Sequence, residues 1–117
     1  MATITTEGLA GRITAAVTEW PGVTARAHSF GGVEFRLGRR ELGHVHGDRL
    51  ADIPFPKRLR DELLKAGRVT RHHALPESGW ASRPIRTTDD ADDVVALLRL
   101  NYERAVAGAE RQRGGGR

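Results

Sequence analysis

Residues 23–55 read VTARAHSFGGVEFRLGRRELGHVHGDRLADIPF and contain four short runs in which apolar and polar residues roughly alternate. A period of two is typical of β-strands that turn one face to the core and the other to water. Gly31–Gly32 and Gly38–Arg39 separate the first three runs, as turns between neighbouring strands do. The segment therefore predicts an antiparallel meander of four strands.

Three helices are predicted around this meander. The first ends at Pro21–Gly22, and its apolar residues recur at helical spacing. The second lies in residues 56–67, where a proline suits the first turn and a glycine the end. The third begins after Thr87 or Thr88 with four aspartates in its first turns, which complement the positive end of the helix dipole.

The order of these elements predicts an α+β fold. We expect an antiparallel sheet of about four to six strands, with N-terminal, middle and C-terminal helices packed on it. The chain of 117 residues suffices for one hydrophobic core but not for two. We expect a single domain in residues 1–110, and a disordered tail rich in glycine and arginine in residues 111–117.

The amino-acid composition restricts the cellular compartment and the binding partners that we expect. The chain has no cysteine, which excludes disulfides and thiolate metal sites. No apolar run approaches the roughly 20 residues that span a bilayer, and the first residues do not read as a secretory signal. We therefore expect a cytoplasmic protein with no membrane partner. The net charge of +4 comes from scattered arginines without interleaved aromatics, so nucleic acid is not the favoured partner.

Two histidines, His44 and His46, stand at alternate positions in the third run of the meander, ELGHVHGD. In a regular strand they share one face with Leu42 and lie roughly 7 Å apart. Glu41 joins them only if Gly43 marks a β-bulge, a common place for a glycine inside a strand. The sequence therefore predicts a pair of imidazoles on one face, with Glu41 beside them if the strand is bulged.

Asp52 and a second histidine pair extend this candidate site. A tight turn after the third run brings Asp52 alongside the two histidines. His72 and His73 follow Arg71, and in an extended segment only one of the two adjacent histidines can face the site. Imidazoles, carboxylates and an arginine together suit general acid–base catalysis near neutral pH. The same nitrogen and oxygen atoms also suit a divalent metal ion.

Four sequence elements follow one another in a distinctive order: E-x-x-H-x-H, a basic residue with a histidine, Gly–Trp at the start of a strand, and a final helix with a tyrosine. These elements are Glu41, His44 and His46, then Arg71–His72, Gly79–Trp80 and Tyr102. Their order and spacing over residues 23–106 resemble the luciferase domain family, which groups fungal luciferases with short bacterial proteins.

The resemblance implies oxygenation of a small molecule. Fungal luciferases oxygenate a hydroxylated pyrone of the hispidin type with O₂, through a peroxide that loses carbon dioxide, and no organic cofactor is implied. By analogy His44 or His46 is the base, Glu41 orients it, and Arg71 and His72 steady the substrate anion. Asp52, Trp80 and Tyr102 are expected to contact the substrate.

Light emission is not expected, because residues 81–86 read ASRPIR where the resemblance calls for an apolar and aromatic strand. Two other functions stay open on the residues alone. One is a metal site formed by His44 and His46 with Asp52 or His72. The other is binding of nucleic acid or a partner protein through arginines at the hairpin ends. Those arginines are Arg36, Arg39, Arg40 and Arg49.

Overall fold

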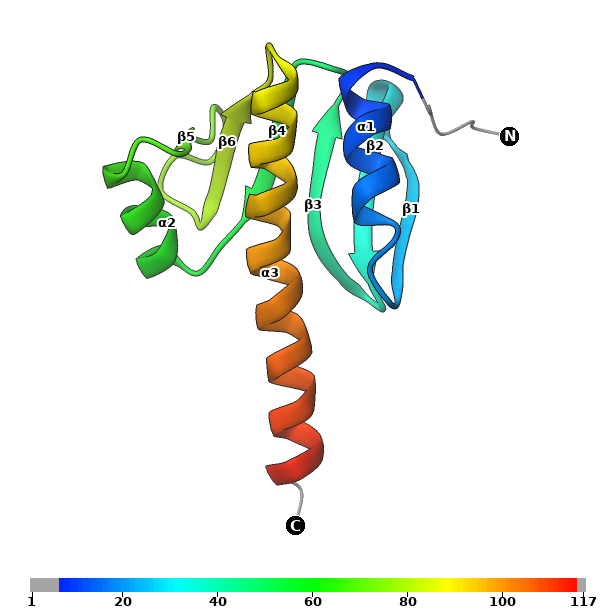
Figure 1. Cartoon of the computed structure of the whole chain (residues 1–117). Helices are drawn as coiled ribbons and strands as arrows, with labels where there is room; N and C mark the ends of the chain where they lie inside the picture. The colour runs from blue at the N-terminus through cyan, green and yellow to red at the C-terminus, as the bar shows by residue number, and fades with distance from the viewer. Residues whose placement is uncertain (1–6, 116–117) are drawn as a thin grey trace.

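The computed structural model describes residues 7–115, and it forms three α-helices and a six-stranded sheet (Figure 1). The helices are α1 (Gly8–Val17), α2 (Lys57–Lys65) and α3 (Thr88–Gly115), and a short 3-10 turn, η1, spans Ser29–Gly31. The strands are β1 (Val23–His28), β2 (Gly32–Leu37), β3 (Arg40–His46), β4 (Leu50–Pro54), β5 (Thr70–Arg71) and β6 (Trp80–Pro84).

All neighbouring strands are antiparallel, in the order β1-β2-β3-β4-β6-β5. The first four strands form the meander predicted from the sequence, because each hairpin connection is too short to carry the chain anywhere except to the neighbouring position. β6 then adds beside β4, and the two-residue β5 forms the far edge. The predicted α+β fold with four to six strands is confirmed.

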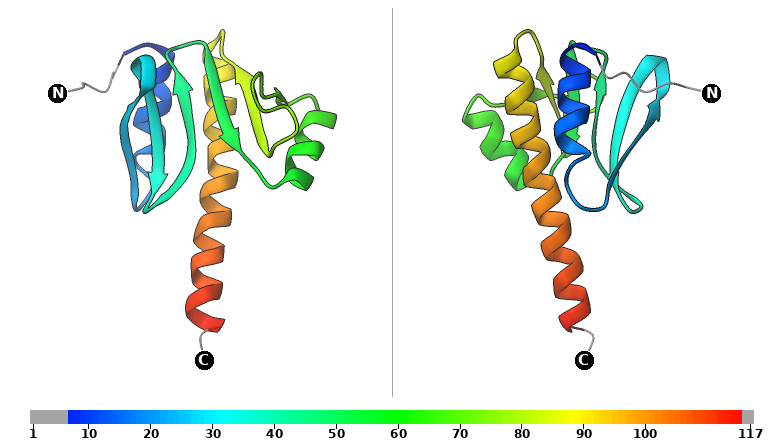
Figure 2. Two further views of the ribbon diagram at one scale, coloured as in Figure 1. Left: turned by 180° about the vertical axis from the view of Figure 1, so that it is seen from behind. Right: turned by 45° about the vertical axis from the view of Figure 1, so that its right-hand side comes forward.

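α1 and α3 cover one face of the sheet, as the views from two sides show (Figure 2). The core lies between these helices and the inward side chains of the central strands. α2 lies at the end of the sheet next to β5 and β6 (Figure 1). The fully buried large side chains come from α1, α3, β2, β3 and β4; among the apolar ones are Ile13, Phe35, Leu42, Val45, Ile53, Leu97 and Leu98.

α3 is longer than the sequence suggested. It continues through Gly115 and so includes residues 111–115, which were expected to belong to a disordered tail, while residues 116–117 lie outside the described part. Glu110, Arg111 and Gln112 are good helix formers, and extending an existing helix avoids the cost of nucleation. The last turns project beyond the sheet (Figure 1). Among residues 7–115, no helix combines the length and apolar character that crossing a membrane requires.

The opposite face of the sheet carries polar side chains, and Figure 2 shows no helix of the described residues lying over it. Directly paired residues of an antiparallel sheet point to the same side, so the pairings define a row that crosses all six strands. In strand order that row is Arg26, Glu34, His44, Asp52, Ser82 and Thr70. The sheet is therefore apolar toward the helices and polar on the other side.

Candidate functional site

A β-bulge in β3 places Glu41 beside the histidines. On β2, Phe35 pairs with Gly43 and the next residue, Arg36, pairs with Glu41. Leu42 is therefore the extra residue of the bulge. Leu42 is fully buried, and a Cβ on Gly43 would lie 2.7 Å from Leu98 Cδ2, so both positions face the helices. Glu41 is thereby turned to the other face, where its Oε2 lies 2.6 Å from His44 Nδ1. The bulge meets the condition under which Glu41 joins the histidines, and it removes Leu42 from the face of His44, where a regular strand would place it.

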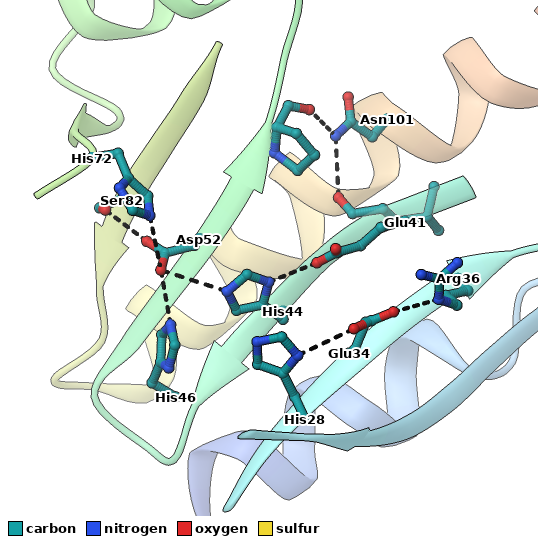
Figure 3. A network of polar contacts seen from close by, with 12 residues as sticks. His28, Glu34, Arg36, Glu41, His44, His46, Asp52, His72, Ser82 and Asn101 are labelled. Atoms are coloured by element: carbon teal, nitrogen blue, oxygen red, sulfur yellow. Dashed lines mark hydrogen bonds and ion pairs between the residues drawn. The ribbon is translucent and has the colours of Figure 1, made fainter. Parts of the chain in front are cut away.

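Asp52 is the centre of the polar network drawn in Figure 3. Its side chain is 1% exposed, and its Oδ1 accepts a hydrogen bond from Ser82 Oγ at 2.7 Å. Three imidazoles face the other oxygen, Oδ2. The distances to their Nε2 atoms are 2.8 Å for His46, 3.5 Å for His72 and 3.6 Å for His44. One buried carboxylate oxygen thus gathers side chains from β3 and from the segment after β5.

The charges of this network stabilise one another. Burial alone would raise the pKa of Asp52, but the neighbouring His44, Ser82 and His46 hold that pKa well below its usual range. Burial alone would likewise lower the pKa of His44, yet the carboxylates of Asp52 and Glu41 raise it to about 9. His44 is therefore a cation at neutral pH, with both ring nitrogens facing carboxylates. Of the two expected bases, His46 is the more accessible, with 37% of its side chain exposed.

The hydrogen bonds of His72 define its tautomer. Its Nδ1 accepts backbone N–H groups from Ala74 at 3.1 Å and from Leu75 at 3.0 Å. An imidazole nitrogen that accepts hydrogen bonds carries no proton, so the proton of neutral His72 sits on Nε2 and points toward Asp52. His73 is exposed, and its ring stacks on His72 with centroids 4.4 Å apart. Of the adjacent pair, His72 makes the contact with Asp52.

His28 belongs to this site although sequence reasoning missed it. Its ring stacks on His44 with centroids 4.2 Å apart, and its Nδ1 lies 3.1 Å from Glu34 Oε1. β1 and β3 are not neighbours, but Gly32 stands opposite His28 on the strand between them and has no side chain to block the ring. The only sequence signal is the alternation in ARAH, which puts Arg26 and His28 on one face.

Arg36 completes the part of the network that lies on β2. Its guanidinium hydrogen-bonds Glu34 and donates to the carbonyl of Arg39 at 2.7 Å. Burial raises the pKa of Glu34, but the hydrogen bonds from Arg36 and His28 outweigh it and lower that pKa. Arg36, one of four arginines considered for nucleic-acid binding, is therefore engaged in holding Glu34 beside His28.

Trp80 lies against the same histidines. Its ring centroid is 5.3 Å from that of His44 and 6.1 Å from that of His72. We call the surface formed by His28, Glu41, His44, His46, Asp52, His72 and Trp80 the histidine face. No helix of the described residues covers it (Figure 2), and the side chain of His46 is 37% exposed. A hollow of about 430 Å³ lies elsewhere, between the β2–β3 turn and the outer part of α3.

Arg71, an expected catalytic residue, does not lie on the histidine face. Arg71 pairs with Ala81, which is buried, whereas the next residue, Ser82, hydrogen-bonds Asp52. The alternation of β5 therefore turns Arg71 away from Asp52. Its half-exposed guanidinium instead donates to the carbonyl of Pro76 at 2.8 Å.

Tyr102 is also away from the histidine face. It belongs to α3, on the other side of the sheet, and is buried. Its hydroxyl donates to the carbonyl of Pro21 at 2.8 Å, and its ring lies 5.3 Å from that of Trp20. Tyr102 therefore joins α3 to the end of α1 and does not contact a substrate bound among the histidines.

The position of Arg71 leads to a prediction. Arg71→Ala is expected to leave the imidazole ¹⁵N resonances of His44 and His46 unchanged, because the guanidinium makes its contacts on the loop. Glu41→Gln should move the His44 resonances, because it removes the charge 2.6 Å from Nδ1. Long-range ¹H–¹⁵N correlation spectra of the two variants make the comparison. Equal shifts of His44 in both variants would contradict this placement of Arg71.

Within residues 7–115, two sets of side chains are arranged so that they can hold a metal ion. In one, His44, His46 and Asp52 each offer an atom, and these atoms lie within 4.8 Å of one another. In the other, Asp52, His72 and His73 meet the same criterion. Both sets share Asp52, and both offer imidazole nitrogen and carboxylate oxygen, which suit divalent transition metals.

The fold and the histidine face define a class: a small α+β protein that carries a cluster of imidazoles and carboxylates on the open side of an antiparallel sheet. The family model described as Luciferase domain matches residues 39–101, more than half of the chain. The chain belongs to the luciferase domain family. The matched region contains Glu41, His44, His46, Asp52, His72 and Trp80, whereas His28 precedes it. Neither the curated proteins nor the solved structures gave a significant match.

Proposed function

We propose that the histidine face binds a small enolic or aromatic molecule and supports its oxygenation by O₂ without an organic cofactor. The observation that carries the proposal is the convergence of His44, His46 and His72 on the buried Asp52, beside an aromatic ring on an open surface. Membership of the luciferase domain family supports the reaction class.

The histidine face has the features that binding an enolate requires. His44 supplies a positive charge, and the imidazoles are held in fixed orientations by Glu41 and Asp52. Pre-oriented charges and N–H groups stabilise an anion more than mobile water does, because they need no reorganisation. The indole of Trp80 offers a flat apolar surface next to the ring of His44, against which a conjugated substrate can pack.

The proposed reaction balances with O₂ as the co-substrate. Ionisation of the enol releases one proton to the solvent and leaves an electron-rich carbon. That carbon forms a bond to O₂, which is reduced to a peroxide anion, and the peroxide takes one proton back. Substrate and O₂ together therefore equal the hydroperoxide, and the oxidised atom is the enolate carbon. The protein contributes stabilisation of the two anions.

A binding and oxygen-uptake experiment tests this proposal. The wild-type protein is expected to shift the absorption spectrum of a hispidin-type pyrone toward that of its enolate, and to accelerate O₂ consumption. His44→Ala and His46→Ala should lose both effects, whereas His73→Ala, which removes an exposed histidine that makes no direct contact with His44 or His46, should keep them. Absence of binding and uptake in the wild type, or unchanged values in both site variants, would overturn the proposal.

A further inference from the structure

We infer that His44 Nε2, His46 Nε2 and Asp52 Oδ2 form a binding site for a divalent transition-metal ion. The inference goes beyond the proposed function, and only its last part, on substrate chemistry, rests on that function. Two imidazoles and one carboxylate from one face are the ligand set of mononuclear non-haem metal sites that leave positions open for substrate and O₂.

The crowding of imidazoles around one carboxylate oxygen supports a bound ion. Three Nε2 atoms face Asp52 Oδ2, although a carboxylate oxygen offers about two lone-pair positions. Only His46, at 2.8 Å, is at a normal hydrogen-bond distance, while His72 and His44 stand at 3.5 and 3.6 Å. Only one of the three imidazoles therefore makes a normal hydrogen bond to this oxygen. An ion bound at Nε2 of His44 and of His46 would displace the proton that cationic His44 carries on Nε2, releasing it to solvent. It would leave the Nε2–H of His72 as the remaining donor to Asp52.

The separations of the two nitrogens from the carboxylate oxygen suit one ion. Metal–nitrogen and metal–oxygen bonds of this kind are about 2.0–2.2 Å long, so neighbouring ligand atoms on one ion lie roughly 3 Å apart. The distances from Asp52 Oδ2 to the two nitrogens, 2.8 and 3.6 Å, bracket that value. His44 and His46 stand two residues apart on one strand, after the bulge, so both rings reach the same side.

The groups behind the three ligands are also in place. A histidine that binds a metal usually donates its other ring N–H to a carboxylate or carbonyl, which orients the ring and makes it a better ligand. Glu41 Oε2 lies 2.6 Å from His44 Nδ1 and can accept this hydrogen bond. Ser82 Oγ holds the second oxygen of Asp52 at 2.7 Å. These contacts fix the orientation of two of the three ligands before any ion binds.

The alternative set of Asp52, His72 and His73 is less suitable. Nδ1 of His72 accepts two backbone N–H groups, so the ring keeps its proton on Nε2 and has no lone pair there to give a metal. The two rings are also stacked, with centroids 4.4 Å apart, and His73 is exposed. We therefore assign His72 as a hydrogen-bond donor to Asp52 and not as a ligand.

Three protein ligands on an open face leave positions that a substrate can fill. His46 is 37% exposed, so the outer side of the ion would meet solvent. A planar molecule with an enol oxygen next to a carbonyl oxygen can occupy two adjacent positions as a chelate. The positive charge of the ion would then stabilise the enolate directly. A bound ion would thus deepen the proposed function, because a hydroxypyrone carries two such neighbouring oxygens.

Metal titration without substrate tests the ion site. The whole chain, purified without a histidine tag and freed of metal by a chelator, is titrated with Zn²⁺ and with Co²⁺. One equivalent of each is expected to bind and to raise the melting temperature. Glu41→Gln should weaken Zn²⁺ binding about 10–100-fold, as loss of an orienting partner does. His46→Gln should weaken it more, whereas His73→Ala should bind as the wild type does.

The outcomes separate the alternatives. Far-UV circular dichroism establishes that each variant is folded. His46→Gln is used as the ligand variant because the His46 side chain is the more exposed of the two histidine ligands and its loss is less disruptive to the core. Absence of saturable binding of both ions overturns the inference. The inference is also overturned if His46→Gln binds Zn²⁺ with wild-type affinity while His72→Ala or His73→Ala no longer binds it. The titration contains no substrate, so its result does not depend on the proposed function. If the protein binds the metal ion but has no effect on the pyrone in the oxygen-uptake experiment, only the proposed function is contradicted.

A matched pair of ligands tests the substrate class. Addition of a hydroxypyrone to the Co²⁺-loaded protein is expected to change the visible cobalt spectrum, because its two oxygens enter the coordination sphere. The corresponding O-methyl ether, which cannot form the chelate through an ionised oxygen, should leave the spectrum unchanged. Equal spectral changes with the two compounds, or no change with either, would overturn the chelate.

Discussion

Asp52→Ala is expected to lower the free energy of unfolding by about 3–5 kcal/mol, the usual cost of removing one partner from a buried charge network. The carboxylate is 1% exposed and faces three imidazoles and a hydroxyl. Its removal leaves the protonated His44 without one of its two counter-charges, and leaves Ser82 without its acceptor. Urea-unfolding curves of the metal-free protein measure the change.

Two further variants control this prediction. Asp92 is an exposed aspartate that forms an ion pair with Arg12, so Asp92→Ala should leave the unfolding midpoint unchanged within error. Asp52→Asn keeps the volume and one acceptor oxygen, and should fall between the wild type and Asp52→Ala. If Asp52→Ala and Asp92→Ala unfold at the same urea concentration, Asp52 does not hold the network together.

Gly43→Ala is expected to lower the free energy of unfolding by about 2–4 kcal/mol, from backbone strain and overpacking combined. Gly43 has a φ of +154°, which residues with a side chain rarely adopt, and a Cβ there would lie 2.7 Å from Leu98 Cδ2 and 3.1 Å from the Asp52 carbonyl oxygen. Relief of this clash would disturb the bulge that turns Glu41 toward His44. Loss of the Glu41-dependent ¹⁵N shift of His44 should therefore accompany the loss of stability.

Gly47→Ala is the matched control for the steric part. Gly47 also has a positive φ, +58°, but an added Cβ there has no neighbour within 4 Å. Its substitution should cost only the backbone term, about 1–2 kcal/mol. The double variant Gly43→Ala/Leu98→Ala should be less destabilised than the sum of the two single variants, because the shorter side chain removes the clash. Strict additivity would mean that Leu98 is not what excludes a side chain at residue 43.

Local patterns in the sequence accounted for most of the fold. Alternation in residues 23–55 predicted the meander, and the aspartates after Thr88 marked the start of α3. The bulge could be stated only as a condition. It depends on how β2 pairs with β3, and a one-residue change of register moves a side chain to the other face. Periodicity alone therefore left Glu41 undecided and placed Leu42 on the wrong face.

The site was predicted in part for the same reason. His44, His46 and Asp52 are close in sequence and joined by a tight turn, so local reasoning brought them together correctly. Arg71 and Tyr102 were assigned from the order of motifs, which carries no information about the face on which a side chain lies. His28 was missed because its contact with His44 passes over a glycine on the intervening strand.

The two tryptophans stand on opposite sides of the sheet. Trp20 packs against Tyr102 in the helical layer, while Trp80 lies beside His44 and His72. The intrinsic fluorescence of the protein therefore combines two signals of different origin, one that reports packing of the helices and one that reports events among the imidazoles. In a Trp20→Phe background, the emission of Trp80 becomes a built-in optical probe for ligands, with no label attached.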